Sequence, residues 1–166
     1  HPGLSTRWVY ACRRPPRTDK ENIVVQEPLS ARDILLALCA GGDDTAQALD
    51  LTRLDDTKWD WLERRAEDYR LLPLLHPLLK AVPGGGVPES LLETCQTEHR
   101  NSVFKSLIMQ HALVEIGGVL DKAGIAYAAL KGGSLSLEFY SEPALRPMRD
   151  LDVLVAPGNA ERAYDL

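Results

Sequence analysis

The chain has 166 residues, of which 45% are hydrophobic and 26% charged, and its formal net charge is −5. This length allows one domain with its own core, or a small helical domain joined to part of another, and the composition excludes a disordered or collagen-like protein. The negative charge argues against a protein that coats nucleic acid, because phosphate binding needs a basic face.

The cysteines, histidines and apolar runs predict a cytoplasmic protein without a metal site built on either residue type. Cys12, Cys39 and Cys95 are odd in number and far apart, so they form no zinc or dithiol motif and are expected to be reduced. The four histidines share no ligand spacing. The run ILLALCAGG is too short to span a bilayer and no leader peptide precedes it, so we expect no membrane association.

Residues 1–28 form the first predicted region, a flexible basic tail. The stretch CRRPPRTDKEN mixes proline with charge and has no steady apolar period, and only IVVQ could pair briefly as a strand. A mobile arm is favoured over a binding arm.

Residues 29–123 form the second predicted region, which is helical. Ser30 is the expected N-cap of a helix through ARDILLALCA that stops at Gly41-Gly42. Thr57 is the expected cap of the next helix, which presents one apolar face made of Trp59, Leu62, Ala66 and Tyr69.

Two more helices complete this region. LLPLLHPLLKAV predicts a short apolar helix around Pro77, followed by a turn at PGGGVP. From Glu89 to about Ala123 there is no proline, which predicts one long helix or two stacked helices, with Gly117-Gly118 as a kink or a point of close packing.

Residues 124–166 form the third predicted region, in which the pattern changes to α/β. We expect a strand at IAYAAL, a helix at SLSLEFY, a loop at EPALRP, a second strand at DLDVLV and the start of a helix at PGNAERAYDL. The fold class is therefore α+β. Because the chain begins without Met and stops in the first turns of a helix, we also expect a piece of a longer protein.

The strand DLDVLV carries two acids one residue apart. Side chains alternate across a strand, so Asp150 and Asp152 should share one face, about 6 to 7 Å apart, while Leu151, Val153 and Val155 pack inward. Two such carboxylates would repel each other unless a cation lies between them, and magnesium is the natural candidate.

Groups suited to phosphate lie on both sides of these acids. Gly132, Gly133 and Ser134 stand where a strand ends and a helix begins, so backbone amides can approach phosphate oxygens. Three cations could grip the same oxygens: Lys131, Arg146 and Arg149. Each feature alone is more often a turn, a solvated strand edge or a surface ion pair, and it is their order along the chain that favours a nucleotide site.

The stretch LKGGSLSLEFYSEPALRPMRDLDVLV resembles the signature of the nucleotidyltransferase-fold families within the DNA polymerase β superfamily. It is most similar to a bacterial group with a Leu-Lys-Gly motif and a second motif reading Arg-x-x-x-Asp-hydrophobic-Asp. The likeness is strong over residues 124–155 and looser from residue 30. It implies that residues 124–166 begin a nucleotidyltransferase-type mixed sheet with flanking helices.

The resemblance also implies an activity. Gly132, Gly133 and Ser134 would hold the β- and γ-phosphates of a nucleoside triphosphate such as ATP, and Asp150 and Asp152 would be catalytic and ligate one or two magnesium ions. The chain would then move a nucleoside monophosphate to a hydroxyl group on a small molecule or a protein, by in-line displacement.

One departure from the family pattern leaves alternatives open. The family carries a third acid on a later strand, and Glu161 and Asp165 on the following helix are poor substitutes for it. A non-catalytic or truncated interaction module is therefore the alternative, and an unrelated helical domain with a partial α/β unit is a third reading. A homo-oligomer is compatible with the sequence, and the acceptor stays unknown.

Overall fold

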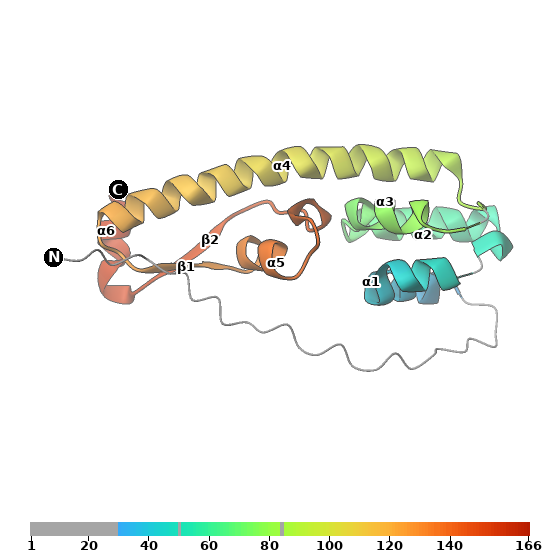
Figure 1. The fold of residues 1–166 in the computed structure, drawn as a ribbon, viewed down its shortest axis with the longest axis horizontal. Coiled ribbons are helices and arrows are strands. Elements are labelled where there is room, and N and C mark those ends of the chain that lie inside the picture. The colour runs from blue at the N-terminus through green and yellow to red at the C-terminus, as the bar shows by residue number, and fades with distance from the viewer. Residues whose placement is uncertain (1–29, 50, 84) are drawn as a thin grey trace.

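The computed structural model describes residues 30–49, 51–83 and 85–166 (Figure 1). The predicted tail and its strand at IVVQ lie outside these residues, as does Cys12. The helices and strands are α1 (Ala31–Ala48), α2 (Asp56–Asp68), α3 (Leu72–Lys80), α4 (Glu89–Lys122), β1 (Tyr127–Leu130), α5 (Gly132–Glu138), β2 (Asp152–Val155) and α6 (Ala160–Tyr164). Three short 3-10 helices accompany them: η1 (Leu51–Arg53), η2 (Pro143–Leu145) and η3 (Pro157–Asn159). A mostly helical chain with one small sheet confirms the predicted α+β class.

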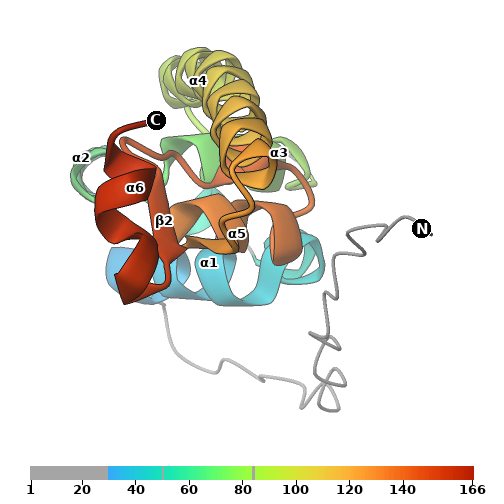
Figure 2. The same cartoon turned by 90° about the vertical axis from the view of Figure 1, so that its left-hand side faces the viewer.

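The long helix α4 connects the two parts of the molecule. It is one continuous helix through Gly117 and Gly118, which confirms the first of the two predicted forms. Its N-terminal half packs on α3, its middle lies over η2, and its C-terminal half lies over α5 and β1 (Figures 1 and 2). The proposed boundary between residues 123 and 124 stays a prediction.

The main core lies in the helical part. The apolar faces of α1, α2, α3 and the first turns of α4 meet there, because each helix carries apolar residues at a spacing of three or four. Trp59, Leu62 and Ala66 on the predicted face of α2 are buried. Tyr69 was predicted to share that face, but it follows the last turn of α2 and is 68% exposed.

One of the two predicted N-caps is confirmed, and the predicted end of α1 is not. The Ser30 hydroxyl accepts the backbone N–H of Asp33, which confirms the predicted cap of α1. The predicted stop at Gly41-Gly42 is wrong, because α1 continues to Ala48; glycine costs a helix only about 1 kcal/mol per residue and does not by itself end it. Thr57 is not the cap of α2. Asp55 is, through a 2.9 Å bond from the Lys58 N–H to its carboxylate.

The two strands form an antiparallel sheet in which Tyr127 pairs with Val155 and Leu130 pairs with Asp152. Alternate residues of β1 are half-buried and exposed, so one face turns toward the protein and the other toward solvent. Leu154 on the outer face is 55% exposed. A hydrogen bond from the Arg162 guanidinium to the Ala123 carbonyl, 2.6 Å long, ties α6 to the end of α4.

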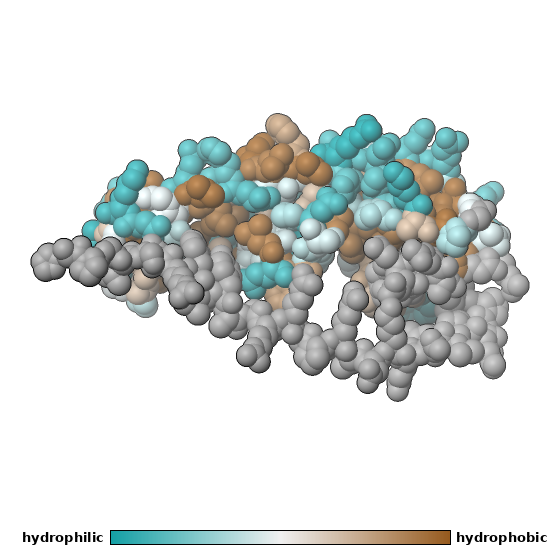
Figure 3. All heavy atoms as spheres, in the orientation of Figure 1, coloured by the Kyte–Doolittle hydropathy of each residue, from teal (hydrophilic) through white to brown (hydrophobic). Residues whose placement is uncertain are grey.

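The outer surface of α4 is unusually apolar. Phe104, Leu107, Ile108 and Val114 are each more than half exposed, and Figure 3 shows apolar atoms gathered over the middle of this helix. Among the described helices, α4 is the one long and apolar enough to cross a membrane, judged by length and composition alone. One such helix is weak evidence, and the expected lack of membrane association stays a prediction.

Candidate functional site

The antiparallel pairing of β1 and β2 brings the two motifs of the sequence together. Leu130, the last residue of β1, lies opposite Asp152, the first residue of β2. Lys131 follows directly, and its ammonium nitrogen lies 3.2 Å from Oδ1 of Asp152. The lysine-glycine motif and the aspartate motif therefore form one local site.

The backbone of Lys131 makes the turn from β1 into α5. Its φ is 48° and its ψ −119°, a region that residues with a Cβ atom rarely adopt. Such a conformation costs about 1 to 3 kcal/mol, and it persists only where the surrounding structure enforces it. Lys131 is thus held in a strained turn beside Asp152.

The glycine pair has a packing function of its own. A Cβ atom on Gly132 would lie 2.9 Å from Cγ of Met148, so this position leaves room for the methionine. A Cβ atom on buried Gly133 would face the sheet, 3.7 Å from Cβ of Ala129 and 3.8 Å from a methyl group of Leu151. The missing side chain of Gly133 therefore points inward, and its predicted contact with phosphate would have to come from its backbone.

Two serines on α5 make different contacts. The Ser134 hydroxyl donates to the Glu138 carboxylate at 2.8 Å, so it would have to leave this partner to hold a phosphate, as the sequence predicts. Ser136, which sequence reasoning missed, is fully buried. Its hydroxyl lies 3.4 Å from the Gly133 carbonyl and 3.8 Å from the Met148 sulfur, which fastens the first turn of α5 to the loop before β2.

Asp150 does not lie in a strand, contrary to the prediction. The partner strand ends at Leu130, opposite Asp152, and the chain then turns away at Lys131, so no backbone is left to pair with Asp150. Asp150 is exposed, and Asp152 is 34% exposed at its side chain. One residue separates the two acids in the sequence. Because Asp150 lies outside the strand, strand alternation does not place the two side chains on the same face.

Asp150 and Asp152 are the residues of this site that could hold magnesium. Two carboxylates offer the hard oxygen ligands that magnesium prefers, and Asp152 already attracts one cation, the Lys131 ammonium. Across the described ranges, no three or more His, Cys, Asp and Glu side chains gather into a group that could hold a metal. Within the described residues, no third acid thus joins Asp150 and Asp152 in such a group.

The two arginines lie in the loop that leads into β2. Arg149 is exposed. Arg146 directly follows η2, and its Nε is buried without a hydrogen-bond partner in the described part of the chain. A buried donor without a partner is costly, so a hydrogen bond at Nε is not what holds this side chain in place.

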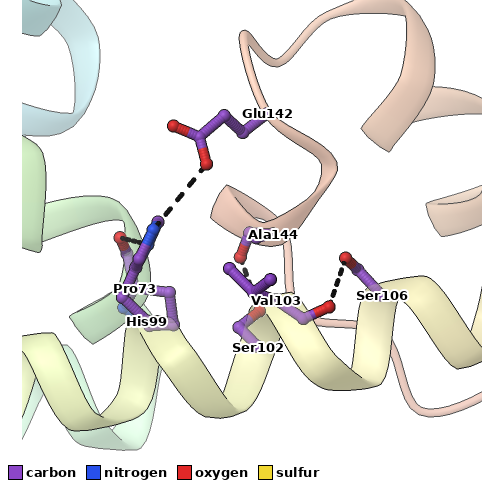
Figure 4. A network of polar contacts seen from close by, with 7 residues as sticks. All are labelled: Pro73, His99, Ser102, Val103, Ser106, Glu142 and Ala144. Carbon is purple, nitrogen blue, oxygen red and sulfur yellow. Dashed lines mark hydrogen bonds and ion pairs between the residues drawn. The ribbon is translucent and has the colours of Figure 1, made fainter.

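A polar network that sequence reasoning missed connects this loop to the helices (Figure 4). The Ser102 hydroxyl donates to the Ala144 carbonyl of η2. His99 Nδ1 lies 3.2 Å from the Pro73 carbonyl, and His99 Nε2 lies 3.7 Å from the Glu142 carboxylate. The sequence signal that could have indicated this network is that His99 and Ser102, two polar residues three positions apart, lie on the inner face of a long apolar helix.

Comparison with known proteins gives a match to a family model. A protein-family model described as "uncharacterised nucleotidyltransferase" matches residues 55–166, which is more than half of the chain and includes both motifs of the site. No curated protein and no solved structure matches the chain. The chain therefore belongs to this family of uncharacterised nucleotidyltransferases.

Proposed function

We propose that the chain is a magnesium-dependent nucleotidyltransferase that moves a nucleoside monophosphate from a nucleoside triphosphate to a hydroxyl group of a small molecule or a protein. The observation that carries this proposal is the pairing of Leu130 with Asp152, which places Lys131 at 3.2 Å from Asp152. Family membership supports nucleotidyl transfer in general. The dependence on magnesium, the use of ATP and the type of acceptor are proposals that go beyond family membership.

Asp150 and Asp152 are the residues that would hold magnesium. When bound, the ion would supply positive charge against the triphosphate and help to align the α-phosphate. In the transfer, the acceptor oxygen bonds to the α-phosphorus while the bond to the bridging oxygen breaks, and pyrophosphate leaves. No protein nucleophile takes part in this transfer, and the acceptor proton passes to solvent.

The cationic and glycine residues would bind the triphosphate. Lys131 balances the Asp152 charge in this structure, and its side chain is 74% exposed, so it is free to turn to a phosphate oxygen. Arg146 and Arg149 would add positive charge from the other motif. Backbone N–H groups at the start of α5, from Gly132 to Ser134, would donate hydrogen bonds to oxygens of the β- and γ-phosphates.

Calorimetric titration with ATP and GTP, with and without magnesium, tests the proposal. We expect binding of at least one nucleotide that depends on magnesium, and we expect the double variant Asp150→Asn/Asp152→Asn to lose it. The matched control is Glu161→Gln/Asp165→Asn, which removes two exposed carboxylates from the α6 segment and changes the net charge equally. Equal nucleotide affinity in the two double variants would refute the site.

A non-catalytic nucleotide-binding module is the second candidate. It is favoured by the lack of a third metal-binding side chain beside Asp150 and Asp152 within the described residues. The two candidates differ in whether a product forms: only the enzyme would transfer the labelled α-phosphate of ATP to an acceptor molecule. Magnesium-dependent binding together with label on a component of a cell extract supports the enzyme, whereas binding without label supports the module.

We further propose a cytoplasmic location without a membrane or nucleic-acid partner, and self-association. Free Cys39 and Cys95 support a reducing compartment. The exposed apolar side chains of α4, among them Phe104 and Val114, support contact with a second copy. Light scattering over a range of protein concentrations tests the self-association, and a constant monomer mass would exclude it.

A further inference from the structure

The loop between α5 and β2, residues 139–151, carries three of the proposed site residues but little regular structure of its own. Arg146, Arg149 and Asp150 all belong to it, and η2 is its one helical turn. A site that must hold a triphosphate needs its charged groups at fixed positions. Whatever fixes this loop therefore acts on the proposed site.

Ser102 fastens the loop to α4 through η2. Its side chain lies on the inner face of α4, in a residue that is 4% exposed, and the hydroxyl donates to the backbone carbonyl of Ala144. Ala144 and Leu145 are buried against the same helix, at 3% and 8% exposure. Arg146 comes next in the chain, so the hydrogen bond anchors the loop one or two residues before the arginine.

His99, one turn earlier on α4, holds the start of the loop. Its side chain is 15% exposed and lies between two acceptors, the Pro73 carbonyl of α3 and the Glu142 carboxylate. Nδ1 is within hydrogen-bond distance of the Pro73 carbonyl, and Nε2 is within ion-pair distance of Glu142, so the ring contacts both α3 and the loop. Figure 4 shows His99 reaching toward Glu142 while Ser102 meets Ala144, so two successive turns of α4 hold two points of the same loop.

We infer that Ser102 and His99 are positioning residues that fix the loop bearing Arg146, Arg149 and Asp150, and through it the proposed nucleotide site. The inference rests on the proposed function. Neither residue belongs to the lysine-glycine or aspartate motif, and neither touches the proposed phosphate or metal ligands through any contact given by the structure. Their effect would pass through the backbone of residues 142–146.

The first test compares Ser102→Ala with Ser106→Ala. Ser106 lies one turn further along α4, and its hydroxyl donates to the Val103 carbonyl of its own helix at 3.0 Å instead of to the loop. Hydrogen exchange of residues 142–150 and calorimetric affinity for MgATP and MgGTP are measured in both. We expect Ser102→Ala to raise loop exchange and to weaken nucleotide binding, each by about fivefold, and Ser106→Ala to change neither.

The second test uses Glu142→Gln, because Glu142 is an exposed residue whose substitution leaves the core intact. Its matched control is Glu115→Gln. Glu115 and His111 form an exposed histidine–glutamate pair, 3.4 Å apart, within α4, and this substitution removes the glutamate charge from it. We expect Glu142→Gln to raise exchange at the start of the loop and Glu115→Gln to leave it unchanged. The global unfolding transition is recorded for every variant, since a purely structural role would lower stability without weakening nucleotide affinity.

The outcomes separate this inference from the proposed function. Unchanged loop exchange in both Ser102→Ala and Glu142→Gln would overturn the inference, as would faster loop exchange with unchanged nucleotide affinity. If the wild-type chain binds neither nucleotide, the proposed function fails, and loop exchange alone then decides whether Ser102 and His99 fix the loop.

Discussion

The Lys131 ammonium lies 3.2 Å from Oδ1 of Asp152, and it reaches this carboxylate from a backbone with a φ of 48°. The residue with the strained backbone is thus also the residue that makes the charged contact. Backbone strain of this kind is most often found at active sites, ligand clamps and switch regions. Glycine would make the same turn without strain, so the lysine is kept at a cost in stability.

A pair of substitutions at this position separates the backbone from the charge. Lys131→Ala and Lys131→Gly both remove the ion pair, which is mostly exposed and contributes little. Only the glycine relieves the positive φ. We expect Lys131→Gly to be more stable than Lys131→Ala by about 1 kcal/mol in urea unfolding. Equal stability of the two variants would show that the turn carries no strain.

The two adjacent glycines of α4 should respond to alanine in opposite directions. A Cβ atom on Gly117 would lie 2.1 Å from the Tyr127 hydroxyl oxygen and 2.9 Å from its ring carbon Cζ, so the Tyr127 side chain would have to shift. A Cβ atom on Gly118 would meet nothing within 4 Å. We expect Gly117→Ala to lower the free energy of unfolding by about 1 to 3 kcal/mol and Gly118→Ala to raise it by up to about 1 kcal/mol. Urea unfolding of the two variants checks this, and the same shift in both would contradict the close packing of Tyr127.

Local signals predicted much of the fold. The apolar period from Glu89 onward, without proline, predicted the helix that became α4, and the change of period at Gly124 predicted two strands around a helix. The two motifs were expected to share one site because of their order along the chain, in which a strand, the glycines, a helix and a loop with arginines precede a strand that opens with the two acids. The register of Leu130 and Asp152 brings them together, although the roles of their residues stay predictions.

Features that depend on a distant partner could not be predicted. Asp150 lies outside β2 because the partner strand has ended, which no local pattern around Asp150 reveals. Ser102 bonds to Ala144, a residue 42 positions away, so nothing near Ser102 indicates the contact. The predicted end of α1 failed for a different reason, because Gly41-Gly42 lowers helix stability without forbidding a helix.

Cys95 should be an unreactive thiol in the folded chain. Burial, followed by the charge of Glu63, raises the pKa of Cys95 to about 12, and at pH 8 the thiolate fraction is then only about 10⁻⁴. We expect iodoacetamide to leave Cys95 unmodified at pH 8 under native conditions and to modify it readily in urea, as followed by mass spectrometry of its peptide. Modification at the same rate in both conditions would mean that the residue is accessible and ionised.

His76 gives the fold a dependence on pH that can be assigned to one residue. Desolvation lowers the pKa of His76, and the charges of His99, Lys80 and Arg100 lower it further against an opposing effect of Glu142. Above its unfolded pKa of about 6.5, His76 is neutral in both states and contributes nothing to the pH dependence. Below that value the unfolded chain binds the proton first, so stability falls as the pH decreases through the folded pKa.

The measurement is urea unfolding of the wild type and of His76→Asn at intervals from pH 7.5 to pH 5. We expect the wild type to lose stability relative to His76→Asn below about pH 6.5, because asparagine takes up no proton. His111→Asn is the control, because His111 is 75% exposed at its side chain, and it should follow the wild type. Parallel curves for the wild type and His76→Asn would show that protonation of His76 costs the folded state nothing.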